Sequence, residues 1–209
     1  MKLTNLSCAQ FSEALAAKKP VPGGGGAAAV TGSLAASLCM MVGNYTIGKK
    51  KYADAEEDVK ALLEKAEKLR IRLLALADED AEAFEPLSRA YRIPKDDPAR
   101  AKVMEQATRN ACLAPLEMVR CCGDLVSLLA EMLEKGSVML ISDVGCGASL
   151  CRAALESAAM NVYINTSSLE DKKFAEQTEK EVGQILRDAI PKAELIITTV
   201  SRKICREED

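Results

Sequence analysis

The chain has 209 residues, a formal net charge of −3, no histidine and no tryptophan. The length is enough for one large domain, and the slightly acidic balance argues against nucleic-acid binding. Without histidine, Ser-His and Cys-His mechanisms and histidine-ligated metals are excluded, so proton transfer must use carboxylates, lysine, tyrosine or cysteine.

The first predicted elements are a short helix and a glycine-rich turn. Ser7 and Gln10 have the spacing of a capping box, which predicts a helix that ends near residue 18, before Pro20. A second proline and the run Gly23–Gly26 follow, and they cannot continue that helix. A helix that begins here would present free N–H groups suited to an anion or a carbonyl of a ligand. The alternative is a plain turn before a core helix.

Residues 26–47 carry no charge and consist largely of alanine, glycine and serine. They predict a helix on which Ala28, Gly32 and Ala36 share one face, so that another backbone can approach closely. The segment is long enough to span a bilayer, but its small and polar residues make it weakly hydrophobic. We therefore interpret it as a helix buried inside a helical assembly and expect no membrane association.

Apolar residues recur at helical spacing from residue 53 to about residue 91, which predicts a long amphipathic helix. Asp80 lies on its apolar stripe. Asp97 is the predicted cap of the next helix, with Pro98 at its first position. Pro115 should kink or split that helix, which is expected to end at Gly136.

Two further helices complete the prediction. One covers about residues 145–164, and the other is capped by Ser168 and interrupted at Pro191. Residues 195–200 form the only run with strand-like composition. Because no linker or repeat divides the chain, we predict a single all-α domain over residues 1–209, a bundle of long helices around a small-residue central helix.

Eight cysteines occur without a C-x-x-C pair, and most have apolar neighbours. This pattern is typical of reduced, buried thiols in a cytoplasmic protein rather than of a metal or redox site. We therefore predict a cytoplasmic location, free thiols and no bound metal.

The run Asp78-Glu79-Asp80 is the strongest chemical signal. Asp80 has apolar helical neighbours, so its carboxylate is either paired or has a raised pKa that suits a general acid–base. The alternative is a solvated acidic run at the edge of a helix. That alternative fits Glu79 best and Asp80 least, with Asp78 between them.

Two other groups of residues are candidates for binding. The loop that contains Lys50, Lys51 and Tyr52 is either a solvated turn after a helix or a recognition site for an acidic substrate tail. Asp143 begins a small-residue helix. Asn161 and Asn165 lie four apart beside apolar residues, so they either bridge helices or contact a polar ring.

The order of five motifs carries a resemblance to a known family. PVPGGGGAAA, YTIGKKKY, LADEDAEAF, SDVGCGASL and NVYIN follow one another along nearly the whole chain. This series resembles the C-terminal family of formiminotransferase-cyclodeaminase, which includes free-standing methenyltetrahydrofolate cyclohydrolases. In that family the loop usually has three glycines and then serine. Here Gly26 replaces the serine, which puts a serine role in doubt.

The resemblance implies an all-helical homodimer that acts on one-carbon tetrahydrofolates, with the folate site near the dimer interface. Asp80 would be the proton shuttle and Asp78 the second choice. The backbone of the glycine loop would approach the substrate, the lysine loop would hold a polyglutamate tail, and other polar side chains would meet the pterin. The residues expected to bind substrate are Gly24, Gly25, Gly26, Lys50, Lys51, Tyr52, Asp143, Asn161 and Asn165.

The main functional prediction is 5-formimidoyltetrahydrofolate cyclodeaminase, in which N10 attacks the formimino carbon and ammonia leaves. The alternative is 5,10-methenyltetrahydrofolate cyclohydrolase on the same scaffold, and the third is a catalytically silent helical binding protein. Both reactions run on a carboxylate without a metal or redox cofactor. A formiminotransferase activity, if the cell has one, is expected on a separate polypeptide.

Overall fold

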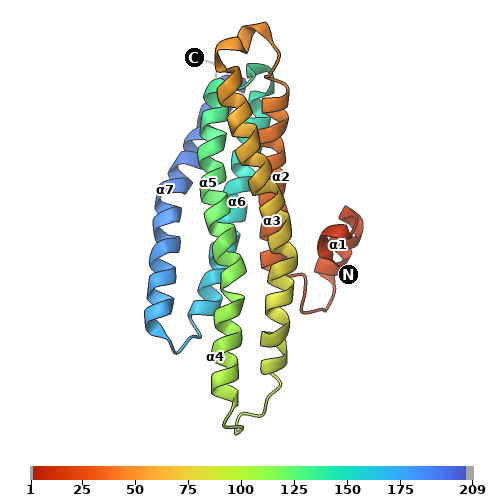
Figure 1. Cartoon of the computed structure of the whole chain (residues 1–209), viewed down its shortest axis with the longest axis vertical. Coiled ribbons are helices and arrows are strands. Elements are labelled where there is room, and N and C mark those ends of the chain that lie inside the picture. The colour runs from red at the N-terminus through yellow and green to blue at the C-terminus, as the bar shows by residue number, and fades with distance from the viewer. Residues whose placement is uncertain (1, 206–209) are drawn as a thin grey trace.

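The computed structural model describes residues 2–205, which form seven α-helices, three short 3-10 turns and no strand. Five long helices lie side by side in an elongated bundle, and α4 continues the line of α5 at its lower end (Figure 1). The all-α prediction is confirmed. The helices are α1 (Cys8–Ala16), α2 (Gly24–Asn44), α3 (Glu56–Ala90), α4 (Arg100–Ala111), α5 (Leu113–Lys135), α6 (Ile141–Thr166) and α7 (Lys172–Ile204), and the 3-10 turns are η1 (Leu3–Asn5), η2 (Lys50–Ala55) and η3 (Val138–Leu140).

Helix α2 packs against α3, α5 and α6 because its small residues allow close approach. A Cβ atom at Gly32 would lie 3.2 Å from both Cys122 Sγ and Leu73 Cδ1, so little room remains between these backbones. Leucines of α3 and α5, among them Leu62, Leu73 and Leu125, fill the core that this packing leaves. Burial of each such side chain contributes about 1.5–3 kcal/mol.

Two helices, Gly24–Asn44 and Val138–Thr166, are long and apolar enough by composition to span a membrane. About half of the first helix is buried within the bundle, and a buried core helix passes the same test of composition. The predicted small-residue central helix is therefore present. It begins at Gly24, so three glycines form its first turn instead of preceding it.

The ends of several helices differ from prediction. The Ser7–Gln10 capping box is confirmed, with Gln10 N–H donating to the Ser7 hydroxyl at 3.2 Å. Asp97 accepts the backbone N–H of Ala99, and α4 begins after that turn at Arg100, not at Pro98. The predicted split near Pro115 occurs at Cys112, where α4 ends and α5 begins.

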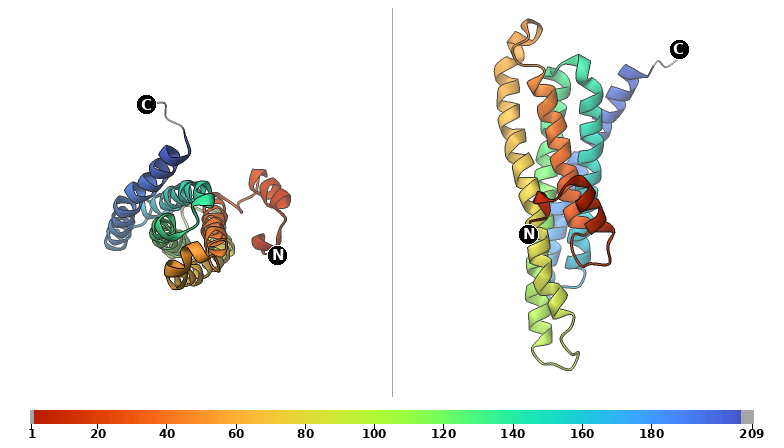
Figure 2. Two further views of the ribbon diagram at one scale, coloured as in Figure 1. Left: turned by 90° about the horizontal axis from the view of Figure 1, so that it is seen from above. Right: turned by 90° about the vertical axis from the view of Figure 1, so that its right-hand side faces the viewer.

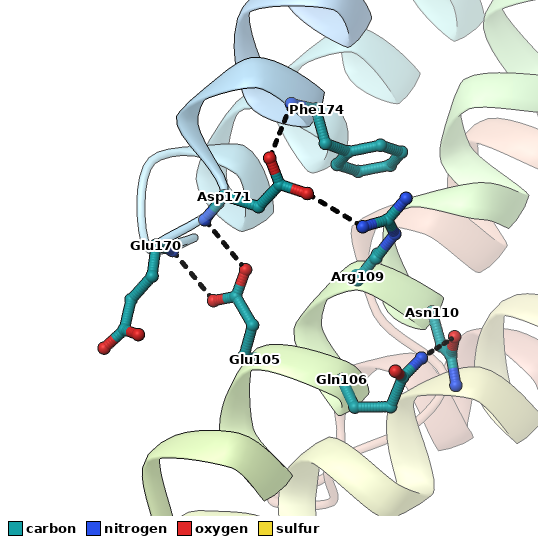
Figure 3. Close-up of polar contacts among 7 residues, drawn as sticks. All are labelled: Glu105, Gln106, Arg109, Asn110, Glu170, Asp171 and Phe174. Carbon is teal, nitrogen blue, oxygen red and sulfur yellow. Dashed lines mark hydrogen bonds and ion pairs between the residues drawn. The ribbon is translucent and has the colours of Figure 1, made fainter.

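The start of α7 corrects the predicted cap. Asp171, not Ser168, caps the helix, and its carboxylate accepts the N–H of Phe174 at 3.0 Å. The same carboxylate forms an ion pair with Arg109 at 2.9 Å (Figure 3). Glu105 of α4 accepts the backbone N–H groups of residues 170 and 171, at 2.8 and 3.0 Å. These contacts with α4 fix where the chain turns, so the cap depends on tertiary structure.

Two other expectations for the C-terminal half were wrong. Pro191 does not interrupt α7, which runs without a break from Lys172 to Ile204. The run 195–200, strand-like only in composition, is helical, in agreement with the all-α prediction. Helix α6 begins at Ile141, four residues earlier than expected. Packing of an amphipathic face provides most helix stability, so it can offset one missing hydrogen bond and a weak β preference.

Helix α1 stands away from the bundle and has no buried residue (Figure 1). In the right-hand view of Figure 2, turned by 90° about the vertical axis, α2 and α6 lie next to each other with α1 crossing in front of their lower part. The surface of these two helices exposes large apolar side chains, and we call it the α2–α6 face. Leu34, Cys146, Met160 and Ile164 are on the helices themselves, and Tyr45 and Met139 lie just beyond their ends.

Candidate active site

The carboxylate of Asp80 on α3 lies against the first turn of α2. A Cβ atom at Gly25 would lie 2.4 Å from Oδ2 and 2.5 Å from Oδ1 of Asp80, closer than side-chain atoms approach one another. Glycine at position 25 is therefore required for this contact. The glycine loop and the acidic run, predicted as separate signals, form one site.

Burial determines the proton affinity of this carboxylate. It raises the pKa of Asp80 from 3.8 to about 6, and a backbone hydrogen bond from Gly26 acts in the opposite direction. No ion pair to Asp80 occurs among residues 2–205. The unpaired, partly buried carboxylate expected from the apolar stripe is present, with a pKa near the range useful for proton transfer at neutral pH.

Asp78 has a different environment. Its Oδ1 accepts the backbone N–H of Leu3 at 2.6 Å and its Oδ2 accepts the hydroxyl of Thr4 at 2.7 Å. The side chain is buried and faces η1, which it fastens to α3. Both of its oxygens are thus engaged with the protein.

The two asparagines of α6 also have different surroundings. A Cβ atom at Gly24 would lie 3.1 Å from Asn161 Nδ2, so Asn161 borders the glycine turn. Its amide donates to the carbonyl of Ser157 at 2.8 Å. Asn165 Nδ2 donates to the carbonyl of Ala111 at 3.1 Å and bridges α6 to the end of α4. Of the two predicted roles, Asn165 bridges helices and Asn161 lies at the site.

The remaining predicted residues lie at the other end of the bundle. Lys50, Lys51 and Tyr52 are in η2, beyond the C-terminus of α2, whereas Asp80 lies at its N-terminus. A helix of 21 residues is about 30 Å long. The Tyr52 hydroxyl accepts the N–H of Val138 at 3.1 Å, just before α6. Asp143, in the first turn of α6, lies near this end, about 27 Å of helix from Asn161.

A groove beside Asp80 was not predicted. It has a volume of about 340 Å³ and lies between the proline turn and the C-terminal part of α3. Phe84 follows Asp80 by one helical turn and Ser88 by about two, whereas Arg92 lies just after the helix ends. The four-residue spacing of Phe84 and Ser88 from Asp80 is the sequence signal that could have identified them. The lining residues are Pro20, Val21, Phe84, Glu85, Ser88, Arg89 and Arg92.

Comparison with known proteins identifies the family. A family model described as formiminotransferase-cyclodeaminase matches residues 7–184. The chain belongs to the formiminotransferase-cyclodeaminase family. This confirms the resemblance of the five motifs and the prediction of a folate one-carbon enzyme family.

Members of the formiminotransferase-cyclodeaminase family with two different names resemble the chain. The methenyltetrahydrofolate cyclohydrolase of Methylorubrum extorquens is 42% identical over 198 residues, covering 93% of this chain and 95% of that protein. The formimidoyltransferase-cyclodeaminase of Mus musculus is 27% identical over 96% of this chain, but the chain spans only 38% of that relative's length. Both relatives are enzymes, as predicted for this chain.

A solved family structure has the same fold. The structure of formiminotetrahydrofolate cyclodeaminase from Thermotoga maritima matches with a TM-score of 0.90 and 29% identity, covering 98% of this chain and all of that one. The helical arrangement that brings Asp80 to the glycine turn therefore belongs to a fold already known in this family.

Proposed function

We propose that this protein is a methenyltetrahydrofolate cyclohydrolase, which adds water to the methenyl bridge of 5,10-methenyltetrahydrofolate and yields 10-formyltetrahydrofolate. Ammonia loss was the main prediction and hydrolysis the alternative, and the sequence alone could not separate them. The 42% identity with the M. extorquens cyclohydrolase, over nearly its full length, supports the hydrolytic alternative better.

The observation that carries the reaction class is the Asp80 carboxylate held against the bare first turn of α2. In its ionised form Asp80 accepts a proton from water as the oxygen adds to the methenyl carbon. It then returns a proton to N5 as the bond between that carbon and N5 breaks. Of the two protons that water loses, one ends on N5 and the other is released. A pKa of about 6 allows both transfers near neutral pH.

Charge and shape also favour this substrate. The methenyl group carries a positive charge shared by N5 and N10, and a carboxylate in a partly buried site attracts it more strongly than one in water. The absence of a side chain at Gly25 lets the carboxylate lie directly against the first turn of α2. Asn161 keeps its oxygen and one amide proton for the polar edge of the pterin, because only one of its protons is donated to Ser157.

Asp78 and Asn165 receive structural roles in this proposal. Asp78 is fully engaged with η1, and Asn165 is bonded to α4.

Neither hydrolysis nor ammonia loss changes an oxidation state, so the proposal invokes no redox cofactor. The predictions of a metal-free enzyme and of a cytoplasmic location stay predictions.

Formimidoyltetrahydrofolate cyclodeaminase is the second candidate. It is supported by the T. maritima cyclodeaminase structure, whose fold this chain shares. The same carboxylate would take a proton from N10 as N10 attacks the formimino carbon and would protonate the departing ammonia. Both reactions therefore require Asp80 to accept and return a proton. They can be distinguished by which substrate the protein consumes.

The test supplies the purified protein with 5,10-methenyl- and 5-formimidoyltetrahydrofolate in separate assays. A cyclohydrolase accelerates loss of the methenyl absorbance, measured against buffer without protein to account for spontaneous hydrolysis. A cyclodeaminase instead creates that absorbance from the formimidoyl compound and releases ammonia. If neither rate exceeds the rate without protein, both enzymatic proposals are wrong, and a silent binding protein is left.

We also propose a homodimer formed through the α2–α6 face. Leu34 of α2 is 53% exposed, and Met160 and Ile164 of α6 are 69% and 70% exposed. Large apolar side chains exposed in this way are typical of protein interfaces. Helix α1, which buries nothing in its own chain, stands beside this face and is positioned to cover part of a second copy.

The dimer is a requirement for the predicted lysine role. With the substrate at Asp80, the lysines of the same chain are about one α2 length, or ~30 Å, away. Lys50, Lys51, Tyr52 and Asp143 can therefore reach that substrate only from a second copy. Their role in binding, and the preference for a polyglutamylated folate, stay predictions.

A further inference from the structure

The groove includes Phe84, one helical turn after Asp80, and leads away from the glycine turn along α3. Phe84 is one helical turn from Asp80 and Ser88 is two turns away, and Arg92 follows just after the end of the helix. Pro20 and Val21, which precede the glycine turn, form the opposite wall. Figure 1 shows that α3 continues past the start of α2, so α2 does not cover these last turns.

The far end of the groove has a cation without a partner. Arg89 forms an ion pair with Glu85 at 2.9 Å, whereas no carboxylate within residues 2–205 pairs with Arg92. Arg92 is not needed to cap α3 either, because the Arg100 guanidinium already donates to the carbonyls of Ala90, Tyr91 and Ile93. The Arg92 guanidinium is therefore available for an anion at the end of the groove.

The dimensions of the groove match one half of the substrate. From N10 of a folate, the aminobenzoyl ring, the amide and the glutamate side chain extend on the order of 10 Å. Arg92 is twelve residues after Asp80, about 18 Å along the helix axis, and its side chain can reach back over part of that length. An aromatic ring placed after N10 would lie beside Phe84, where stacked or edge-to-face packing is favourable.

We propose that this groove binds the aminobenzoyl-glutamate half of the substrate, with Phe84 against the ring and Arg92 paired with a glutamate carboxylate. This inference rests on the proposed folate function and adds the subsite that holds the tail. It assigns tail recognition to residues of the same chain, in place of the distant lysine loop. Arginine suits this role because its planar guanidinium can form two parallel hydrogen bonds with a carboxylate.

The experiment compares Arg92→Gln with wild type on two substrates, 5,10-methenyltetrahydrofolate and 5,10-methenyltetrahydropteroate, which lacks the glutamate. Losing a charge-assisted pair should raise KM for the first substrate about 10-fold or more, with little change in kcat. On the second substrate, the variant and wild type should be equal. Arg202→Gln, which removes an exposed arginine of α7 outside the groove, is the matched control and should change neither value.

Several outcomes would overturn the subsite. An unchanged KM in Arg92→Gln, or an equal loss on both substrates, would show that Arg92 does not contact the glutamate. If Lys50→Gln or Lys51→Gln shows the glutamate-dependent loss in its place, the tail lies at the lysine loop of a second copy.

Binding measurements separate this inference from the proposed function. Calorimetric titration of wild type and Arg92→Gln with tetrahydrofolate and tetrahydropteroate needs no turnover. An inactive wild type that binds tetrahydrofolate through Arg92 would refute the proposed reaction and keep the subsite. An active wild type whose affinities do not depend on Arg92 would refute the subsite alone, and a protein that binds neither compound would refute both.

Discussion

Asp78 and Asp80 are two residues apart on α3, and their carboxylates contact different parts of the protein. Such residues point about 200° apart around a helix axis. Asp78 binds the backbone of Leu3 and the hydroxyl of Thr4, whereas Asp80 faces the glycine turn of α2. The two aspartates of this acidic run thus have different roles: Asp78 anchors η1, and Asp80 is the candidate catalytic group. Substitutions at the two positions should therefore have opposite effects on stability and on turnover.

Replacing the candidate shuttle should remove turnover without harming the fold. Asp80→Asn keeps the shape but cannot transfer a proton, so kcat should fall by about 10²–10⁴-fold. Binding of tetrahydrofolate, measured by calorimetry, should change little. Turnover close to that of wild type would contradict the role of Asp80 in proton transfer.

The pH dependence follows from the raised pKa of about 6 for Asp80. Because the ionised form is the base, kcat/KM should rise with pH and reach half of its plateau near that value. The folded state binds more protons than the unfolded state between about pH 4 and 6, so wild type loses stability relative to Asp80→Asn as pH rises through this range. The variant should be more stable at pH 7, by on the order of 2–3 kcal/mol. Below pH 4 the two should converge, as measured by urea unfolding.

Asp78→Asn should lower stability and spare the chemistry. Hydrogen bonds to a charged group contribute about 1.5–3 kcal/mol, and the variant weakens the bonds that hold η1 to α3. We expect a lower melting temperature, with kcat reduced far less than in Asp80→Asn. An intact melting temperature together with a large loss of kcat would reverse the assignment of the two aspartates.

Neighbouring glycines should differ sharply in their tolerance of a side chain. Gly25→Ala places a Cβ atom 2.4 Å from the Asp80 carboxylate and must displace it, so activity should be lost. At Gly26 the nearest atom to an added Cβ is Pro22 Cβ at 3.4 Å, an ordinary contact. Gly26→Ser, which restores the usual family residue, should therefore fold and retain activity. Equal activity of these two variants would contradict the described approach of Asp80 to α2.

A charge on the α2–α6 face should separate the proposed dimer. Leu34→Glu places a carboxylate in the centre of that face, and sedimentation at micromolar concentration should then show a monomer. Ile71→Glu is the matched control, because Ile71 on α3 is 54% exposed, almost the same as the 53% of Leu34, but lies outside the face. A wild-type monomer of 22.4 kDa would refute the dimer itself.

The two halves of the site could be found in the sequence because each signal is local. Asp80 interrupts an apolar stripe within two turns of one helix, and four consecutive glycines mark a bare backbone. Their contact could not be found, because it depends on how α2 packs along α3. The same limit applies to the cap of α7, where Glu105 of another helix determines the turn at Asp171.

The lysine loop and Asp143 were predicted to bind the same substrate as Asp80 because the family resemblance includes all of their motifs. The length of α2 separates them from Asp80 within a single chain, and that length was readable from the uncharged stretch itself. The effect of proline on the helices was overestimated. Pro191 suggested an interruption, but α7 passes through it, as α3 does through Pro86, because packing along a long helix offsets one lost hydrogen bond.

Because some cysteines are buried and others are exposed, their rates of alkylation should report on different events in this molecule. Five thiols are buried, and burial raises the pKa of Cys39 to about 12, so almost none of it is in the reactive thiolate form. Cys8 and Cys205 are exposed and should react at once. Cys146 lies on the α2–α6 face, so its rate should fall as protein concentration rises and copies associate. The buried thiols should react only as the bundle opens, which lets one reagent time both association and unfolding.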